Sequence, residues 1–358
     1  MKKILFLISI LIPDLFGIAS VKNMDPSLKI STLYGEITTT DAVIKELIES
    51  SAFKRLKNIR QYGVTYYANQ EYEYTRYQHS LGVYFITKKF GAPLEEQVAG
   101  LLHDVSHTVF SHVGDIFFDN NYRTGKNSYQ DNIHEWYLEK SGITEILKKY
   151  GLEKSCCLEK KKTQLCFDQN LPNLCADRIE YNLAGGFIDN LISKEDILNI
   201  INNLYFENRN WFFKDKTIAK QFGLLSIKLS ELRWGATWDN FVSFQASQAM
   251  KQACKIKLID HNDIHFSTDD IIWNRLNTSE DPEIKKSVGK VKNHKNSYII
   301  CDQENSDLHL IGKFSGTDPL VQINNTLLSL SQIDENYKQE FDKVKQTITQ
   351  GTFIKYLD

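Results

Sequence analysis

The stretch LLHDVSHTVFSHVGD, from Leu101 to Asp115, indicates the fold of this chain more strongly than any other segment. Three histidines and two aspartates fall within its last thirteen residues, directly after an apolar run that predicts a helix. Polar groups at this density are costly to bury unless something compensates them. A divalent metal ion and a polyanionic substrate would do so. Because the adjacent His103 and Asp104 can offer a nitrogen and an oxygen to one ion, we expect a metal site here.

Two further polar residues lie in segments that are otherwise apolar. His79 falls in a predicted helix from Tyr77 to Phe90, and Asp177 falls in a predicted helix from Leu171 to Phe187. Each would be an awkward buried group without a partner. They are therefore candidates for the third and fourth ligands. Mixed nitrogen and oxygen ligation suits Mn, Fe, Co, Ni or Zn better than it suits a thiolate-preferring ion.

The order His, then His-Asp, then Asp resembles that of the HD superfamily of metal-dependent phosphohydrolases. More narrowly, five stretches are similar to the deoxynucleoside triphosphate triphosphohydrolases, which include dGTPase-like enzymes. These stretches are FKRL (53–56), IRQYG (59–63), TRYQHSLGV (75–83), HDVSHTVFSHVGD (103–115) and DRIEY (177–181). The similarity runs from about residue 28 to 252, and TDPLV (317–321) is similar to an element of that family's C-terminal lobe. In the family, water attacks the alpha-phosphorus of a dNTP and releases a nucleoside and inorganic triphosphate.

The resemblance implies roles for individual residues. The metal ligands it implies are His79, His103, Asp104 and Asp177. The residues it implies around the phosphates are His107, His112, Asp115 and His134, with Glu135 following His134. The substrate contacts it implies are Gln61, Arg76, Arg178, Tyr181 and Arg233, and Mg²⁺ is expected with the substrate phosphates. Since imidazole titrates near neutral pH, we expect His134, supported by Glu135 or Asp115, to act as general acid or base.

The sequence departs from that family in the part that contacts the nucleotide. Arg233 is followed by Thr237, Phe241 and Ser243, where the family usually has a histidine, a tyrosine and a histidine. Gly185 stands where a sugar-contacting aspartate is often found. Hydrolysis is therefore better supported than a dNTP substrate. The alternatives are an HD phosphohydrolase acting on another phosphomonoester or phosphodiester, such as extracellular nucleotides, and a non-catalytic nucleotide-binding HD protein.

Composition favours a mainly α protein. The 358 residues include only six prolines, and 43 basic against 45 acidic residues argue against coating nucleic acid by bulk charge. We expect an HD helical bundle over residues 28–252, with a metal core at 76–183. A smaller mixed α/β C-terminal lobe would follow at 253–358, with an exposed linker at 279–296. The family resemblance also implies a homo-oligomer.

The N-terminus predicts export. Lys2 and Lys3 precede a short apolar run that ends at Pro13, which is typical of a secretory signal peptide over residues 1–19 and too short for a membrane span. Cleavage would leave a periplasmic or secreted protein in which Cys166 with Cys175, or one of the adjacent Cys156 and Cys157 with another cysteine, could form a disulfide. If translation instead starts at Met24, the protein is cytoplasmic.

Overall fold

The computed structural model describes residues 27–69, 73–118, 128–158 and 166–357. The predicted signal segment over residues 1–19 lies outside these residues. The helices are α1 Ala42–Glu49, α2 Ser51–Arg55, α3 Thr65–Ala68, α4 Arg76–Lys89, α5 Leu94–Leu102, α6 Val113–Phe118, α7 Tyr129–Lys140, α8 Ile143–Lys149, α9 Ala176–Ile188, α10 Lys194–Asn202, α11 Lys216–Leu232, α12 Thr237–Lys255, α13 His261–Phe266, α14 Asp269–Asn277, α15 Pro282–Lys292, α16 Leu330–Ile333 and α17 Glu335–Gln350, with short 3₁₀ turns at Leu56–Asn58, Lys154–Cys156 and His294–Asn296. The predicted mainly α class is confirmed.

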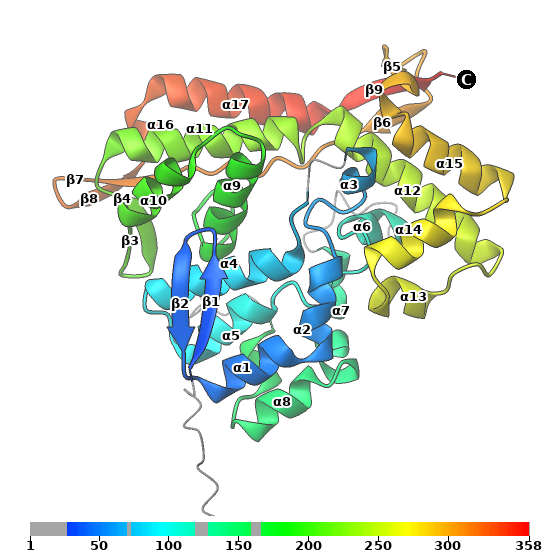
Figure 1. Cartoon of the computed structure of the whole chain (residues 1–358). Helices are drawn as coiled ribbons and strands as arrows, with labels where there is room; N and C mark the ends of the chain where they lie inside the picture. The colour runs from blue at the N-terminus through cyan, green and yellow to red at the C-terminus, as the bar shows by residue number, and fades with distance from the viewer. Residues whose placement is uncertain (1–26, 70–72, 119–127, 159–165, 358) are drawn as a thin grey trace, which may run out of the picture.

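Three small sheets lie at the edges of the helical body (Figure 1). The strands are β1 Leu28–Thr32, β2 Gly35–Thr39, β3 Leu204–Glu207, β4 Asn210–Phe213, β5 Tyr298–Ile300, β6 Leu308–Leu310, β7 Leu320–Ile323, β8 Thr326–Ser329 and β9 Thr352–Tyr356. β1 and β2 form an antiparallel hairpin, β3-β4-β7-β8 form a mixed sheet, and β5-β9-β6 form an antiparallel sheet. Within the described residues, no helix is long and apolar enough to cross a membrane.

The helices that carry the predicted ligands start where local chemistry favours a start. Thr75 caps α4 in a capping box with Gln78, which satisfies backbone N–H groups at the helix start. α5 follows Pro93 and ends at Leu102, so His103 lies at its C-terminal end. α9 starts five residues later than predicted, because Leu171 and Pro172 form a turn and Asn173 a bend before the extended N-cap residue Cys175. α4 packs against both α5 and α9, which brings the three ligand-bearing segments together.

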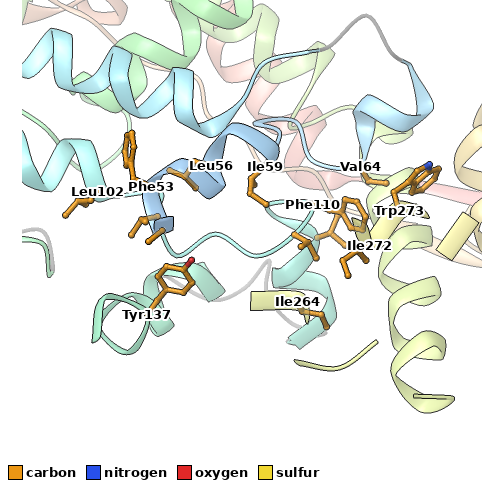
Figure 2. Packing of buried hydrophobic residues seen from close by; sticks show 14 of the residues in the cluster. Phe53, Leu56, Ile59, Val64, Leu102, Phe110, Tyr137, Ile264, Ile272 and Trp273 are labelled. Atoms are coloured by element: carbon orange, nitrogen blue, oxygen red, sulfur yellow. The ribbon is translucent and has the colours of Figure 1, made fainter. Parts of the chain in front are cut away.

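The hydrophobic core extends across the predicted domain boundary at residue 252. That boundary falls inside α12, and one buried cluster joins Phe53 and Phe110 to Ile264 and Trp273 (Figure 2). A second cluster likewise joins α4 and α9 to α11 and α17, of which the last two lie side by side in Figure 1. The C-terminal residues therefore complete the core of the helical body.

The prediction of an exposed linker at 279–296 is wrong. Most of it forms α15, which buries Ile284, Val288 and Val291 against the core. Their spacing of four and three residues is that of one helix face. The many charged residues between them lie on the opposite, solvated side, which is why the segment's composition suggested a linker.

Candidate metal centre and active site

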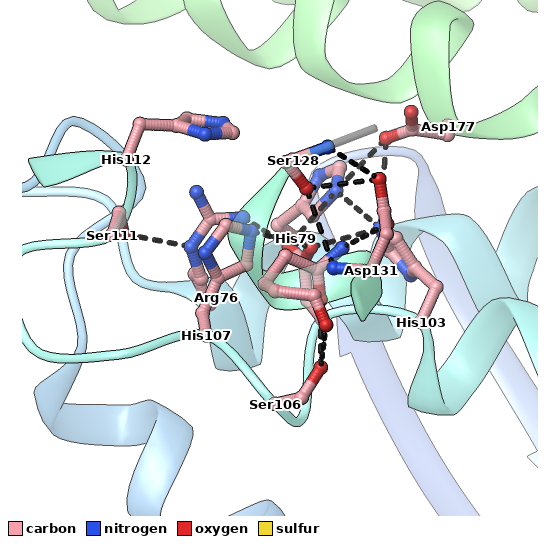
Figure 3. A network of polar contacts seen from close by, with 12 residues as sticks. Arg76, His79, His103, Ser106, His107, Ser111, His112, Ser128, Asp131 and Asp177 are labelled. Atoms are coloured by element: carbon pink, nitrogen blue, oxygen red, sulfur yellow. Dashed lines mark hydrogen bonds and ion pairs between the residues drawn. The ribbon is translucent and has the colours of Figure 1, made fainter. Parts of the chain in front are cut away.

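Three of the four predicted ligands converge on one point (Figure 3). His79 comes from the first turn of α4, His103 from the end of α5, and Asp177 from the first turn of α9. The Nε2 atoms of His79 and His103 lie 3.1 Å apart, and Asp177 Oδ1 lies 3.1 Å from the first and 3.6 Å from the second. His79 is buried, whereas the Asp177 side chain keeps 29% of its surface exposed, so solvent can reach the point from the α9 side.

The hydrogen bonds of the two imidazoles leave bare nitrogens facing each other. Nδ1 of His79 donates to Glu180, and Nδ1 of His103 donates to the Gly100 carbonyl at 2.8 Å. When both rings are neutral, both Nε2 atoms carry lone pairs beside the Asp177 carboxylate, an arrangement that either a proton or a metal ion satisfies. Although burial lowers it, the charge of Glu180 and the carboxylate hydrogen bonds raise the pKa of His79 to about 10. Two imidazole nitrogens and a carboxylate oxygen fit a divalent first-row metal.

Asp104, the fourth predicted ligand, lies beside this cluster and is also bound by two other side chains. Its Oδ2 and Oδ1 atoms lie 3.5 Å from Nε2 of His79 and of His103, respectively. Arg76 forms a buried ion pair with Oδ2, and His107 Nε2 donates to Oδ1 at 3.2 Å. Burial and then the charge of Arg76 lower the pKa of His107 to about 3, so its ring is neutral. Arg76 and His107, predicted to contact substrate, therefore position a predicted ligand, because both are buried against Asp104.

Glu180 is the residue of this site that we did not single out from the sequence. It is fully buried and contacts Nδ1 of His79, while the hydroxyls of Tyr34 and Tyr74 donate to its other oxygen at 2.9 and 2.5 Å. It can lie there because residue 82 is glycine, where a Cβ would stand 2.7 Å from Glu180 Cγ. A carboxylate behind a ligating histidine fixes its tautomer and increases its basicity. Glu180 follows Asp177 by three residues on one helix face, which was a usable signal.

A second polar pair lies next to the cluster. His112 Nδ1 donates to Asp115 Oδ2 at 2.9 Å, and the ring of His112 lies 5.0 Å from that of His107. The side chain of His112 is 48% exposed, while Asp115 is buried and also accepts from the backbone N–H of Tyr129 at 2.7 Å. Although burial raises it, the hydrogen bond from His112 holds the pKa of Asp115 below its usual value. Asp115 thus stays ionised, orients His112 and leaves its Nε2 for proton transfer.

Comparison with known proteins places this geometry in a family. The HD domain model matches residues 76–134. The Bacillus subtilis protein YdhJ, which has no assigned function, is 30% identical over 319 residues that cover 88% of this chain and 95% of YdhJ. The chain belongs to the HD metal-dependent phosphohydrolase family.

Other relatives are more distant or partial. The metal-dependent phosphohydrolase cns2 of Cordyceps militaris is 34% identical over 180 residues, which cover 48% of each chain. The deoxynucleoside triphosphate triphosphohydrolase SAMHD1 of Gallus gallus is 28% identical over 139 residues, 34% of this chain and 22% of SAMHD1. A crystal structure of a hypothetical protein from Aquifex aeolicus has the same fold, with a TM-score of 0.66 at 17% identity over 90% of this chain and 99% of that one.

In this HD protein, His134 is supported by a serine and not by a carboxylate. Its Nδ1 lies 2.7 Å from Ser106 Oγ, whose hydroxyl lies 2.7 Å from Gln130 Oε1. A hydroxyl that donates to Gln130 must accept from Nδ1–H, which leaves a lone pair on Nε2. That Nε2 is buried and has no hydrogen-bond partner among the described residues. The prediction that Asp115 supports His134 is therefore wrong, because Asp115 is bound to His112.

The neutral His134 predicts a pH effect on stability. Burial lowers the pKa of His134 to about 4, so the folded state takes up its proton only near that pH. The unfolded chain takes it up near pH 6.5, so stability that is present above pH 6.5 is lost as the pH falls toward 4. Between pH 7.5 and 4.5, we expect the wild type to lose about 2 to 3 kcal/mol more unfolding free energy than His134→Gln. Urea titrations of both proteins at both pH values measure the difference, and equal losses would contradict it.

Glu135 does not reach the site. Its side chain is 55% exposed and pairs with Lys154 at 2.7 Å on the outer face of α7, so the prediction that it supports His134 is wrong. The next position on a helix points about 100° away, which separates Glu135 from His134. We expect Glu135→Gln to keep turnover within about twofold of wild type and to cost less than about 1 kcal/mol of stability, as for an exposed pair. Steady-state kinetics and a urea titration check this, and a tenfold drop in kcat would restore the catalytic role.

The predicted substrate residues Gln61 and Arg178 differ in whether their side chains form hydrogen bonds within the protein. Arg178 donates to the Asn173 carbonyl at 2.9 Å and to Cys175 Sγ at 3.2 Å, which holds the start of α9. Gln61 Oε1 is buried and has no hydrogen-bond partner among the described residues. Cys175 is a free thiol, as is Cys166, so the pairing expected for an exported chain is not formed here. Gln61 thus offers an acceptor to a ligand, while Arg178 is engaged with the protein.

Three further positions that the family resemblance connects with substrate are Tyr181, Arg233 and Gly185. Tyr181 lies one helical turn after Asp177, and its ring lies 5.0 Å from that of Trp234. Arg233 forms a buried ion pair with Asp189. A Cβ at Gly185 would stand 2.8 Å from the hydroxyl of Tyr62, so that hydroxyl fills the space of a side chain at 185. The position where the family often has a sugar-contacting aspartate is closed by a tyrosine.

Proposed function

We propose that this protein hydrolyses a nucleotide phosphoester with a bound divalent metal, and that a dNTP, cleaved to a deoxynucleoside and triphosphate, is the first substrate to test. The observation that carries the proposal is the pair of bare imidazole nitrogens of His79 and His103, which face each other beside Asp177. Mn, Fe, Co, Ni and Zn all suit this donor set. The exposed edge of Asp177 supports access for a substrate.

A metal bound there lowers the pKa of water and polarises a phosphoryl oxygen. The protein groups supply the rest of the chemistry. His112, oriented by Asp115, can give a proton to the leaving oxygen through Nε2. His134 presents a buried lone pair at Nε2, which a substrate or its attacking water can satisfy. Gln61 Oε1 can accept a hydrogen bond from a substrate hydroxyl.

A phosphomonoester or phosphodiester other than a dNTP is the second candidate, and a specific observation favours it. The hydroxyl of Tyr62 fills the space at Gly185, and Arg76 and Arg178 are engaged with protein groups. At three positions that the triphosphohydrolase resemblance assigns to substrate contact, this chain therefore has a group that contacts the protein itself. SAMHD1, the triphosphohydrolase among the relatives, aligns with only 34% of this chain, whereas cns2 supports hydrolysis without naming a substrate class.

Product analysis separates the two candidates and also tests for the absence of catalysis. The full chain, loaded in turn with Mn²⁺, Co²⁺ and Zn²⁺, is incubated with each dNTP, each nucleoside monophosphate and bis-p-nitrophenyl phosphate. Nucleoside plus inorganic triphosphate supports the dNTP assignment, while orthophosphate or nitrophenol alone supports the second candidate. Turnover of none of these with any metal would reject both and leave a nucleotide-binding protein.

Export and assembly are further proposals. The basic and apolar N-terminus supports a signal peptide over residues 1–19, which N-terminal sequencing of protein from the native host would test. A mature N-terminus near residue 20 supports export, and one at Met24 supports a cytoplasmic protein. The HD resemblance supports a homo-oligomer, which light scattering of the purified chain would test.

A further inference from the structure

Asp269, the first residue of α14, connects two distant segments of the chain through their backbones. It is fully buried, and its two oxygens accept hydrogen bonds from two backbone N–H groups, that of Arg60 at 2.8 Å and that of Phe110 at 2.7 Å. These segments precede Asp269 by 209 and 159 residues. A buried carboxylate that satisfies two backbone donors is a strong local constraint, because its burial shields the two N–H groups from bulk water that could replace it.

The loop that Asp269 holds carries a strained backbone. Phe110 and Ser111 have φ angles of 57° and 55°, in the left-handed region that non-glycine residues rarely adopt. Other contacts support the same loop. The Val109 N–H donates to the Ile264 carbonyl at 3.0 Å, and the ring of Phe110 packs against Trp273 of α14 (Figure 2). The segment between α5 and α6, which includes His107 and His112, therefore keeps its shape through contacts with α13 and α14.

A chain of hydrogen bonds continues from this loop to Asp104. Ser111 Oγ donates to the Arg60 carbonyl at 2.6 Å and accepts from Arg76 Nε at 2.7 Å. Arg76 in turn forms the buried ion pair with Asp104. Asp269 binds the N–H of Phe110, which precedes Ser111 in the chain, and the N–H of Arg60, whose carbonyl accepts from Ser111. It therefore fixes Ser111 from two sides. A shift of either segment would move the hydroxyl that orients Arg76.

We propose that Asp269 is a positioning residue, which fixes the loop between α5 and α6 so that Asp104 and His112 face the metal point. The activity side of this proposal rests on the proposed function, whereas its metal-binding side does not. Asparagine is the sharpest replacement, because it has the same shape but only one acceptor oxygen. Its amide group would direct hydrogens at one of the two backbone N–H groups and leave that donor unsatisfied.

The test compares Asp269→Asn with Asp270→Asn in the full-length chain. Asp270 is a matched control because it lies next to Asp269 on the same helix and, among the described residues, binds the side chains of Arg60 and Tyr67. For Asp269→Asn, we expect the Kd for Mn²⁺ to rise roughly tenfold, as for loss of an outer-shell partner of a metal site. Amide hydrogen exchange in the peptide spanning residues 104–112 should also become faster. The control should stay near wild type in both measurements.

Ser111→Ala is a second variant that removes the hydroxyl link to Arg76 and leaves Asp269 in place. It decides the matter if Asp269→Asn does not fold: a weaker Kd for Mn²⁺ supports the proposal, and an unchanged Kd overturns it. A folded Asp269→Asn with wild-type Mn²⁺ affinity and wild-type exchange also overturns it. If the wild type binds Mn²⁺ but hydrolyses no phosphoester, the proposed function fails, while the affinity and exchange data still judge the role of Asp269.

Discussion

Asp177→Ala is expected to abolish metal binding and to reduce hydrolysis on the order of 10³-fold or more, while the protein stays folded. The loss follows from removing the carboxylate oxygen that lies 3.1 Å from Nε2 of His79, and with it the Lewis acid, which would contribute several kcal/mol to the transition state. The fold should survive because the Asp177 side chain is 29% exposed and pairs with two imidazoles, which can remain neutral.

Metal content by mass spectrometry and kcat with the best substrate measure this prediction. Asp342→Ala on α17 is the matched control, since this aspartate is more than half exposed and pairs only with Lys338 one turn away. A metal-loaded Asp177→Ala protein would show that the site is elsewhere. Asp104→Ala is a poor substitute for this test, because it would leave Arg76 buried without its carboxylate and cost about 3 to 5 kcal/mol of stability.

The second large effect is expected at Glu180, whose carboxylate contacts Nδ1 of His79. Glu180→Gln is expected to weaken metal binding by about 10- to 100-fold, because the neutral amide no longer increases the basicity of the ligating imidazole. Gly82→Ala should act on the same carboxylate by steric pressure, since its Cβ would stand 2.7 Å from Glu180 Cγ. Overpacking of this kind costs about 1 to 3 kcal/mol of unfolding free energy. Titration with Mn²⁺ and urea denaturation measure the two effects.

Gly289→Ala is the matched control for Gly82→Ala. Both glycines lie inside helices, but a Cβ at 289 meets no atom within 4 Å. Alanine at an open helix position should stabilise the protein by about 0.5 to 1 kcal/mol, so the two variants are expected to change stability in opposite directions. If Gly82→Ala is as stable as Gly289→Ala and binds metal normally, the close packing of Glu180 against residue 82 affects neither stability nor metal binding, and the prediction is wrong.

Local patterns predicted the elements that carry the site. The apolar run over 77–90 and the one directly before His103 correspond to α4 and α5, in which every residue from His79 to Thr87 and from Val98 to Leu102 is buried. A one-face repeat was present in α15 at Ile284, Val288 and Val291, where the surrounding charges obscured it. The late start of α9 shows the limit of such patterns, since Leu171 is apolar yet 42% exposed and lies in a turn before the helix.

The partners of the polar side chains could not be predicted in the same way. The sequence suggested that Asp115 or Glu135 supports His134, yet Asp115 binds His112 and the partner of His134 is Ser106. Ser106 and His134 lie 28 residues apart, a separation over which no local pattern predicts a contact. Glu135 follows His134 directly, and this adjacency in sequence places it on another face of α7.

By itself, the sequence determined which chemistry is available: histidines and aspartates in the HD order, placed on helices whose apolar faces must be buried. It also determined the HD family, because that order is a property of residue type and spacing. Only the tertiary structure decided that His79 and His103 present bare nitrogens to one point, that Asp104 is held by Arg76, and that Asp269 joins α14 to the active-site loop. The physical reason is range: helix formation depends on neighbours within one or two turns, whereas a buried hydrogen bond forms only where the packed core brings distant donors and acceptors within about 3 Å.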